Sequence, residues 1–217
     1  MVVFHKLQRV SVLVDVQNLY YSGKHLYNSK VNFKAVLKEA VKGRGLIRAI
    51  AYVIRADVKE ENNFFDALEM MGYEVKAKDL QVFYGGAKKG DWDIGIAMDA
   101  IELAPKTDTV VIVSGDGDFV ALVEHLKRGM GCRVEAMAFG RSASSMLKEA
   151  VDMFSDMDKD KKKYLISSYR NNSSSQSRTA ASRTTSATKA VSKAPIRAVS
   201  TTPTRAVSAV PKIAQKK

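Results

Sequence analysis

Aspartates stand where the sequence pattern predicts that a strand ends or a helix begins. Asp116 and Asp118 follow Val110–Val113, a run of β-branched residues typical of a strand buried on both faces. Asp15 ends a similar run, and Asp93 opens a predicted helix. Crowded carboxylates need a compensating cation, and oxygen ligands without histidine or cysteine suit Mg²⁺ or Mn²⁺. Such a metal site activates water and stabilises the charge on a phosphate group during in-line displacement.

Each of these aspartates also has a purely structural interpretation. Asp116 suits the cap of a helix, and Asp118 and Asp93 suit a first helical turn, where the helix dipole favours negative charge. Asp99 lies on the apolar stripe of the helix that Asp93 opens, where a carboxylate is costly unless it is paired. A hydrogen bond to a neighbouring hydroxyl or backbone group is the structural alternative there. The repetition of aspartates at several predicted element ends favours the metal site.

Strands and helices alternate up to about residue 157, which predicts an α/β fold: a three-layer sandwich with a mainly parallel central sheet. Because the carboxyl ends of parallel strands share one edge, we expect the aspartates to meet there. Gly115 and Gly117 are expected to let the chain turn sharply at this edge. The predicted strands cover residues 9–15, 47–54, 108–114 and 133–139, with short segments at 73–77, 80–84 and 153–154, and the predicted helices cover residues 33–41, 60–71, 91–104, 118–129 and 143–150.

The composition indicates one globular domain in a reducing compartment. With 217 residues, 46% of them hydrophobic, the chain is long enough to bury a single core. One cysteine, Cys132, excludes an internal disulfide. No apolar run approaches the roughly 20 residues of a membrane span, and the first residues lack the pattern of a signal peptide. We therefore expect a cytoplasmic protein.

The net charge of +12 belongs to the end of the chain. Residues 159–217 contain fourteen Lys or Arg and one acid, whereas residues 1–158 contain twenty-one basic and twenty-two acidic residues. The end is rich in Ser, Thr and Ala and poor in aromatic residues, a composition that cannot bury enough surface to fold. We therefore expect a globular domain over residues 8–157 and a disordered basic tail over residues 159–217. The tail either grips phosphates without sequence preference or only solubilises the protein.

Three motifs stand in order at the predicted element ends. They are Asp15-x-x-Asn18, Lys89-Gly90-x-x-Asp93 followed by Asp99, and Ser114-Gly115-Asp116-Gly117-Asp118-Phe119. Together they resemble the NYN domain of the LabA-like group, within the PIN-like nuclease superfamily, and the resemblance covers about residues 8–156. The family often has Gly directly after the first aspartate, and the Val16-Gln17 found here affects the shape of that loop more than its chemistry.

The resemblance implies a PIN-like fold and a metal-dependent endonuclease that hydrolyses phosphodiester bonds of RNA. We expect this RNA to be single-stranded. Mg²⁺ or Mn²⁺ is the implied cofactor. The oligomeric state stays open, a homodimer included. The residues carried over are the catalytic and metal-binding acids Asp15, Asp93, Asp116 and Asp118, with Asn18, Asp99 and Ser114 in supporting positions.

Basic and aromatic residues outside these motifs suggest contacts with RNA. Lys88 and Lys89 stand in a predicted glycine-rich loop over residues 85–90, where they either hold a phosphate or remain solvated. Tyr20, Tyr21 and Tyr27 either stack on unpaired bases or form partly buried surface.

Two other classes of protein remain. A non-catalytic RNA-binding or regulatory NYN module would keep the fold and bind through the tail, and the presence of every acid argues against it. A haloacid-dehalogenase-like phosphatase also places an aspartate after its first strand. That chemistry needs a second acid two residues later, and Gln17 occupies this position.

Overall fold

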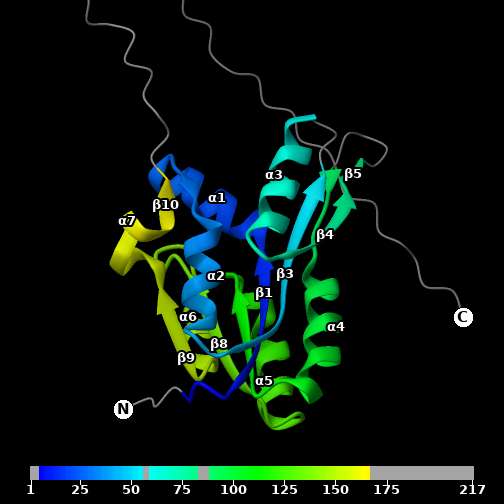
Figure 1. Ribbon diagram of the computed structural model, residues 1–217, viewed down its shortest axis with the longest axis vertical. Coiled ribbons are helices and arrows are strands. Elements are labelled where there is room, and N and C mark those ends of the chain that lie inside the picture. The colour runs from blue at the N-terminus through cyan, green and yellow to red at the C-terminus, as the bar shows by residue number, and fades with distance from the viewer. Residues whose placement is uncertain (1–4, 56–58, 83–87, 167–217) are drawn as a thin grey trace, which may run out of the picture. The chain divides into compact units, whose positions relative to one another are not determined.

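A computed structural model describes residues 5–55, 59–82 and 88–166, and the predicted tail beyond residue 166 lies outside the described residues. The centre of the fold is a six-stranded sheet in the order β4–β3–β1–β7–β8–β9, in which every neighbouring pair is parallel (Figure 1). The predicted parallel sheet is therefore confirmed. Its strands are β1 Arg9–Asp15, β3 Gly45–Arg55, β4 Glu74–Asp79, β7 Thr109–Val113, β8 Arg133–Ala138 and β9 Met153–Asp156.

Helices cover both faces of the sheet, as the alternation of side chains along β1 requires. Val10, Val12 and Val14 pack into the core beneath α1, α2 and α3, whereas Leu13 packs into the core beneath α4, α5 and α6. This confirms the three-layer α/β sandwich. No helix among the described residues is both long and apolar enough to cross a membrane. The helices are α1 Val16–Tyr27, α2 Phe33–Val41, α3 Lys59–Met70, α4 Asp93–Leu103, α5 Val120–Arg128 and α6 Ser145–Ala150.

The strand order reverses between β1 and β7. From β1 the chain adds β3 and β4 on one side, and it later adds β7, β8 and β9 on the other. At such a point the connections leave the two strands in opposite directions, and ligands of open α/β sheets bind in the space between them. Asp15 ends β1, and Asp116 follows β7. The topology therefore brings these two aspartates to the same part of the edge.

The first helix, α1, is absent from the sequence-based prediction. Asp15 forms its N-cap, and only three of its residues are buried. One of them is Gly23, where a Cβ would lie 2.9 Å from Val31 Cγ2, so a larger residue would push the helix away from its neighbour. Apolar periodicity does not reveal a helix whose packing depends on a glycine. Its buried residues are Val16, Leu19 and Gly23.

Two small antiparallel sheets complete the fold. One pairs β2 Lys30–Val31 with β10 Leu165–Ile166, and the other pairs β5 Gln81–Val82 with β6 Lys88–Lys89. The second corrects the prediction of a loop over residues 85–90, because Lys88 and Lys89 lie on a strand. Residues 83–87 lie outside the described part of the chain.

Residues 157–166 pack on the domain, which therefore extends to Ile166 instead of ending at residue 157. Tyr164 is only 6% exposed, and its carbonyl accepts a hydrogen bond of 2.8 Å from Asn32 N. We predicted that this segment belongs to the tail because four lysines precede Tyr164, and the local pattern does not show that this tyrosine is buried. The segment comprises the 3₁₀ helix η3 Met157–Asp160, the helix α7 Lys161–Tyr164 and the strand β10.

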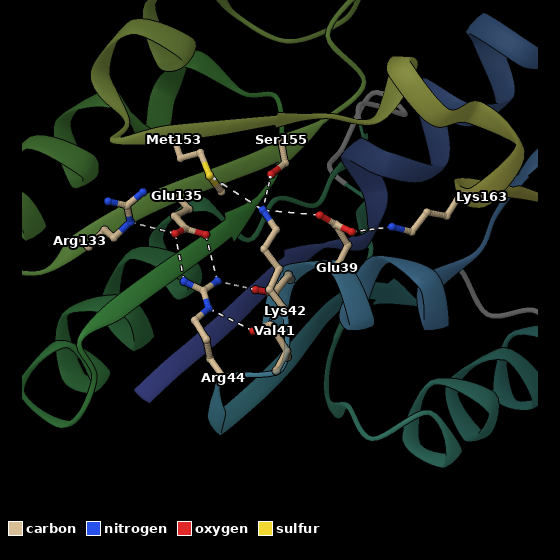
Figure 2. A network of polar contacts seen from close by, with 10 residues as sticks. Glu39, Val41, Lys42, Arg44, Arg133, Glu135, Met153, Ser155 and Lys163 are labelled. Atoms are coloured by element: carbon tan, nitrogen blue, oxygen red, sulfur yellow. Dashed lines mark hydrogen bonds and ion pairs between the residues drawn. The ribbon is translucent and has the colours of Figure 1, made fainter. Parts of the chain in front are cut away.

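A buried ion pair joins the loop after α2 to β8. The Arg44 guanidinium donates to both carboxylate oxygens of Glu135, each at 3.0 Å, and the two side chains are 0% and 2% exposed. Figure 2 shows this pair beside a chain of polar contacts that runs from Lys42 through Glu39 to Lys163 on α7. The contacts fix α2 and the C-terminal segment against the sheet.

Candidate functional site

Three carboxylates meet at the carboxyl edge of the sheet. Asp93, Asp116 and Asp118 each offer an oxygen, and these oxygens all lie within 4.8 Å of one another. Asp93 is the first residue of α4, whereas Asp116 caps the 3₁₀ helix η2, Gly117–Phe119, in which Asp118 lies. Among the residues that the structure describes, this group has the spacing needed to hold a metal ion.

Asp15 is connected to this group through Ser114, a fully buried residue. The Ser114 hydroxyl donates to Asp15 Oδ2 at 3.4 Å and accepts a hydrogen bond of 3.2 Å from the backbone N–H of Asp116. One hydroxyl therefore contacts both the end of β1 and the loop that follows β7. Ser114 holds the carboxylate that ends β1 beside the loop that follows β7.

Asn18 joins the same two loops at a second point. Its backbone N–H donates to Asp15 Oδ1 at 3.0 Å, and its side-chain Oδ1 accepts a hydrogen bond of 3.1 Å from Gly115 N. The spacing of three residues between Asp15 and Asn18 follows from this geometry, because Asp15 caps α1 and Asn18 lies in its first turn. The amide thereby fixes the position of the loop that carries Asp116.

Gly115 and Gly117 permit a close approach between loops, which the sequence pattern did not predict. Neither residue adopts the left-handed backbone conformation. A Cβ on Gly115 would lie 3.0 Å from Ala143 Cα, and one on Gly117 would lie 2.9 Å from Ser144 Oγ. Ser144 N also donates to the Gly115 carbonyl at 2.9 Å. The loop before α6 therefore supports the aspartate loop, a contact that no motif in the sequence indicates.

Burial and neighbouring acids disfavour the ionised form of Asp15. The pKa of the Asp15 carboxyl is raised to about 6, mainly by burial and to a smaller extent by the nearby carboxylates of Asp93 and Asp116. Hydrogen bonds from Asn18 and Ser114 lower it, since they stabilise the ionised form. A divalent cation would offset the repulsion among these acids. Their all-oxygen donor set fits a hard cation such as Mg²⁺ or Mn²⁺.

Asp99 has other partners. Its two oxygens accept hydrogen bonds of 2.9 and 2.8 Å from Lys76 Nζ, and one of them also accepts a bond of 2.7 Å from the Tyr52 hydroxyl. Burial, and next this hydrogen bond, raise the pKa of Tyr52. The hydrogen bond from a neighbouring hydroxyl, which was the structural alternative for Asp99, is therefore present and comes from Tyr52. Lys76 could not be predicted as a partner from the local pattern, because its contact depends on β4 lying next to β3.

The structure describes the backbone of Lys88 and Lys89 only. Both residues form β6, which pairs with β5, and Asp93 begins α4 four residues after Lys89. The hairpin therefore leads directly into one of the clustered carboxylates. Contact of these two lysines with RNA stays a prediction.

Comparison with known proteins gives a consistent result. The model of the family described as "NYN domain" matches residues 9–165. Low amplitude and bright protein LabA of Synechococcus elongatus is 25% identical over 160 residues, which cover 69% of this chain and 83% of that protein. A crystal structure of a protein of unknown function from Vibrio parahaemolyticus is 33% identical and has a TM-score of 0.69, covering 76% of this chain and 100% of the other.

Proposed function

Because the chain belongs to the NYN domain family, in its LabA-like group, we propose that it is a metal-dependent endoribonuclease. The observation that carries the proposal is the set of carboxylates at the carboxyl edge of the sheet, where the strand order reverses between β1 and β7. Asp93, Asp116 and Asp118 converge there, and Ser114 holds Asp15 beside them. NYN domains belong to the PIN-like nuclease superfamily. Family and geometry thus support the same reaction class.

In this proposal the clustered aspartates hold Mg²⁺ or Mn²⁺. Such a cation, when bound, activates a water and stabilises the negative charge of the phosphate under attack. Asp93, Asp116 and Asp118 provide its ligands, and Asp15 extends the anionic edge on the side of β1. Ser114 and Asn18 act as positioning residues, because their hydrogen bonds fix Asp15 relative to the loop that carries Asp116. Asp99 supports the site through Tyr52 and Lys76.

The substrate in this proposal is RNA, and positively charged parts of the chain bring it to the carboxylates. Lys88 and Lys89 contact a phosphate near the start of α4. The residues after Ile166 contain ten Lys or Arg and no acid, so they add a sequence-independent attraction for the RNA backbone. The tail then contributes to binding only, whereas the domain contributes both binding at Lys88 and Lys89 and the chemistry.

A cleavage assay tests the reaction. Purified protein is incubated with an unstructured RNA and with a hairpin RNA in Mg²⁺, in Mn²⁺ or in EDTA, and Mn²⁺ binding is measured by calorimetry. We expect cleavage with either metal, none in EDTA, and recovery when excess metal is added back. Cleavage that EDTA leaves unchanged would contradict the metal site. Intact RNA under every condition would leave a non-catalytic RNA-binding module as the function.

Removing the residues after Ile166 should weaken RNA binding and flatten its dependence on salt. Ten positive charges are lost, and each Lys or Arg that contacts a phosphate steepens the fall of affinity with rising salt. The chain ending at Ile166 keeps the buried Tyr164 and the β2–β10 pair, so it retains the described fold. Affinity for one RNA is measured across a salt series for both chains. Equal slopes would mean that the tail takes no part in binding.

A further inference from the structure

Two tyrosines are exposed side by side on α1. Tyr20 and Tyr21 are 47% and 48% exposed, and their ring centroids lie 5.6 Å apart with the planes at 69°. Within the described part of the chain neither hydroxyl takes part in a hydrogen bond. These side chains lie outside the buried core, and about half of each is open to solvent.

Cationic and aromatic side chains one helical turn further on orient both rings. Lys24 Nζ lies 5.5 Å from the centroid of the Tyr20 ring. The ring of His25 stacks on Tyr21 with centroids 5.9 Å apart and planes 18° apart. The four residues share one exposed face of the helix, because positions i, i+1, i+4 and i+5 lie on the same side. Aromatic rings held in place beside a positive charge are what unpaired nucleotides bind: the rings stack on bases and the charge attracts phosphate.

Tyr27 is a third tyrosine on α1, and its surroundings differ from those of Tyr20 and Tyr21. Its ring packs on Phe139 with centroids 5.4 Å apart, and its hydroxyl donates to Asp158. Both contacts join α1 to other elements of the fold. The structure therefore separates Tyr27, a packing residue, from Tyr20 and Tyr21.

The exposed face begins close to the carboxylates. Asp15 caps α1, and Asn18 in its first turn binds the loop that carries Asp116. With a rise of 1.5 Å per residue, Tyr20 lies roughly 8 Å and Lys24 roughly 13 Å further along the helix axis than Asp15. Figure 1 shows α1 at the end of the sheet where the strands terminate, above α2. An RNA strand on this face would lead into the carboxylate site.

We propose that Tyr20, Tyr21, Lys24 and His25 form a platform on which unpaired bases of RNA stack next to the carboxylate site. The proposal deepens the proposed function, on which it rests, because it names single-stranded segments as the substrate class. Bases of an RNA duplex are already stacked inside the helix and cannot reach the rings, so the platform selects single strands, loops and ends. RNA is favoured over a protein ligand because Lys24 supplies charge complementary to phosphate.

Binding in EDTA separates stacking from charge and from cleavage. The full chain is titrated at raised salt, which suppresses the contribution of the tail, with a uridine oligomer, an abasic oligomer of equal length and an RNA duplex. We expect the double variant Tyr20→Leu/Tyr21→Leu to bind the uridine oligomer at least about tenfold more weakly. Its affinity for the abasic oligomer should stay unchanged, and the matched variant Tyr20→Phe/Tyr21→Phe should bind like the wild type. Lys24→Ala should weaken binding of both oligomers.

The outcomes distinguish this proposal from the nuclease assignment. Unchanged uridine binding by the leucine variant, or an equal loss for the abasic oligomer, would overturn the platform even if the wild type cleaves RNA. Loss confined to the uridine oligomer would support the platform even if no cleavage occurs. If the leucine variant fails to fold, crosslinking of 4-thiouridine RNA to the wild type decides: crosslinks at Tyr20 or Tyr21 support the proposal, and crosslinks elsewhere contradict it. Loss of self-association with RNA affinity unchanged would show that this face binds another copy of the chain instead.

Discussion

Asp116→Asn should reduce metal-dependent RNA cleavage by about a thousandfold or more while leaving the fold intact. Its carboxylate lies within the group formed with Asp93 and Asp118, so removal of the charge takes away a metal ligand. The local structure should survive, since Asp116 Oδ1 accepts a hydrogen bond of 3.0 Å from Asp118 N, and the amide oxygen of asparagine can accept the same bond. Cleavage rate, Mn²⁺ binding and thermal unfolding are measured together.

Asp156→Asn is the matched control. Asp156 also caps a 3₁₀ helix and accepts a hydrogen bond of 2.9 Å from the backbone N–H two residues later, on Asp158. It differs in lying outside the carboxylate group. We expect this variant to cleave RNA at the wild-type rate. Wild-type cleavage by Asp116→Asn would remove the centre of the nuclease proposal, and equal losses in both variants would point to a structural effect of capping.

The sequence predicted the sheet well because its signals are local. Val110–Val113 and the run that ends at Asp15 are too short and too rich in β-branched residues for helices, and each became a central strand. Parallel strands share a carboxyl edge, so placing aspartates at these ends also predicted that they would meet. This argument covers Asp15 and Asp116, which follow neighbouring strands. Asp93 begins α4, so its convergence with Asp116 and Asp118 depends on how that helix packs against the sheet.

Features that depend on contacts between distant segments could not be predicted in this way. Gly115 was assigned to a turn because its neighbour Ala143, 28 positions later, is invisible in a local pattern. Lys76 was not predicted as a partner of Asp99, because it reaches Asp99 only after β4 has joined the sheet. Tyr164 was assigned to the tail because its burial depends on α2 and β2. In each case the partner of the residue lies in a distant segment, so its contacts follow from tertiary packing and cannot be read from the local pattern.

Asp15→Asn should stabilise the metal-free protein at neutral pH, and this effect has a defined pH window. Burial raises the pKa of Asp15 from 3.8 to about 6 in the folded state. The folded protein therefore holds a proton between about pH 4 and pH 6 that the unfolded chain has released, and stability is lost as pH rises through this range. At about 1.4 kcal/mol per pKa unit, the ionised carboxylate costs the folded state up to about 3 kcal/mol above pH 6.

The asparagine variant isolates that cost. Asparagine is a good N-cap, so α1 keeps its hydrogen bond from Asn18 N while the buried charge disappears. In chemical unfolding without metal, the variant should exceed the wild type by up to about 3 kcal/mol at pH 7.5 and match it near pH 4. Saturating Mg²⁺ should reduce or reverse the difference, because binding to the folded wild type adds stability that the variant loses. Asp156→Asn should gain no such stability, since Asp156 accepts charge-assisted bonds from Gly140 N and Asp158 N. A variant of Asp15 less stable than the wild type at pH 7.5 would mean that its carboxylate stabilises the metal-free fold, and repulsion at the site would no longer argue for a cation.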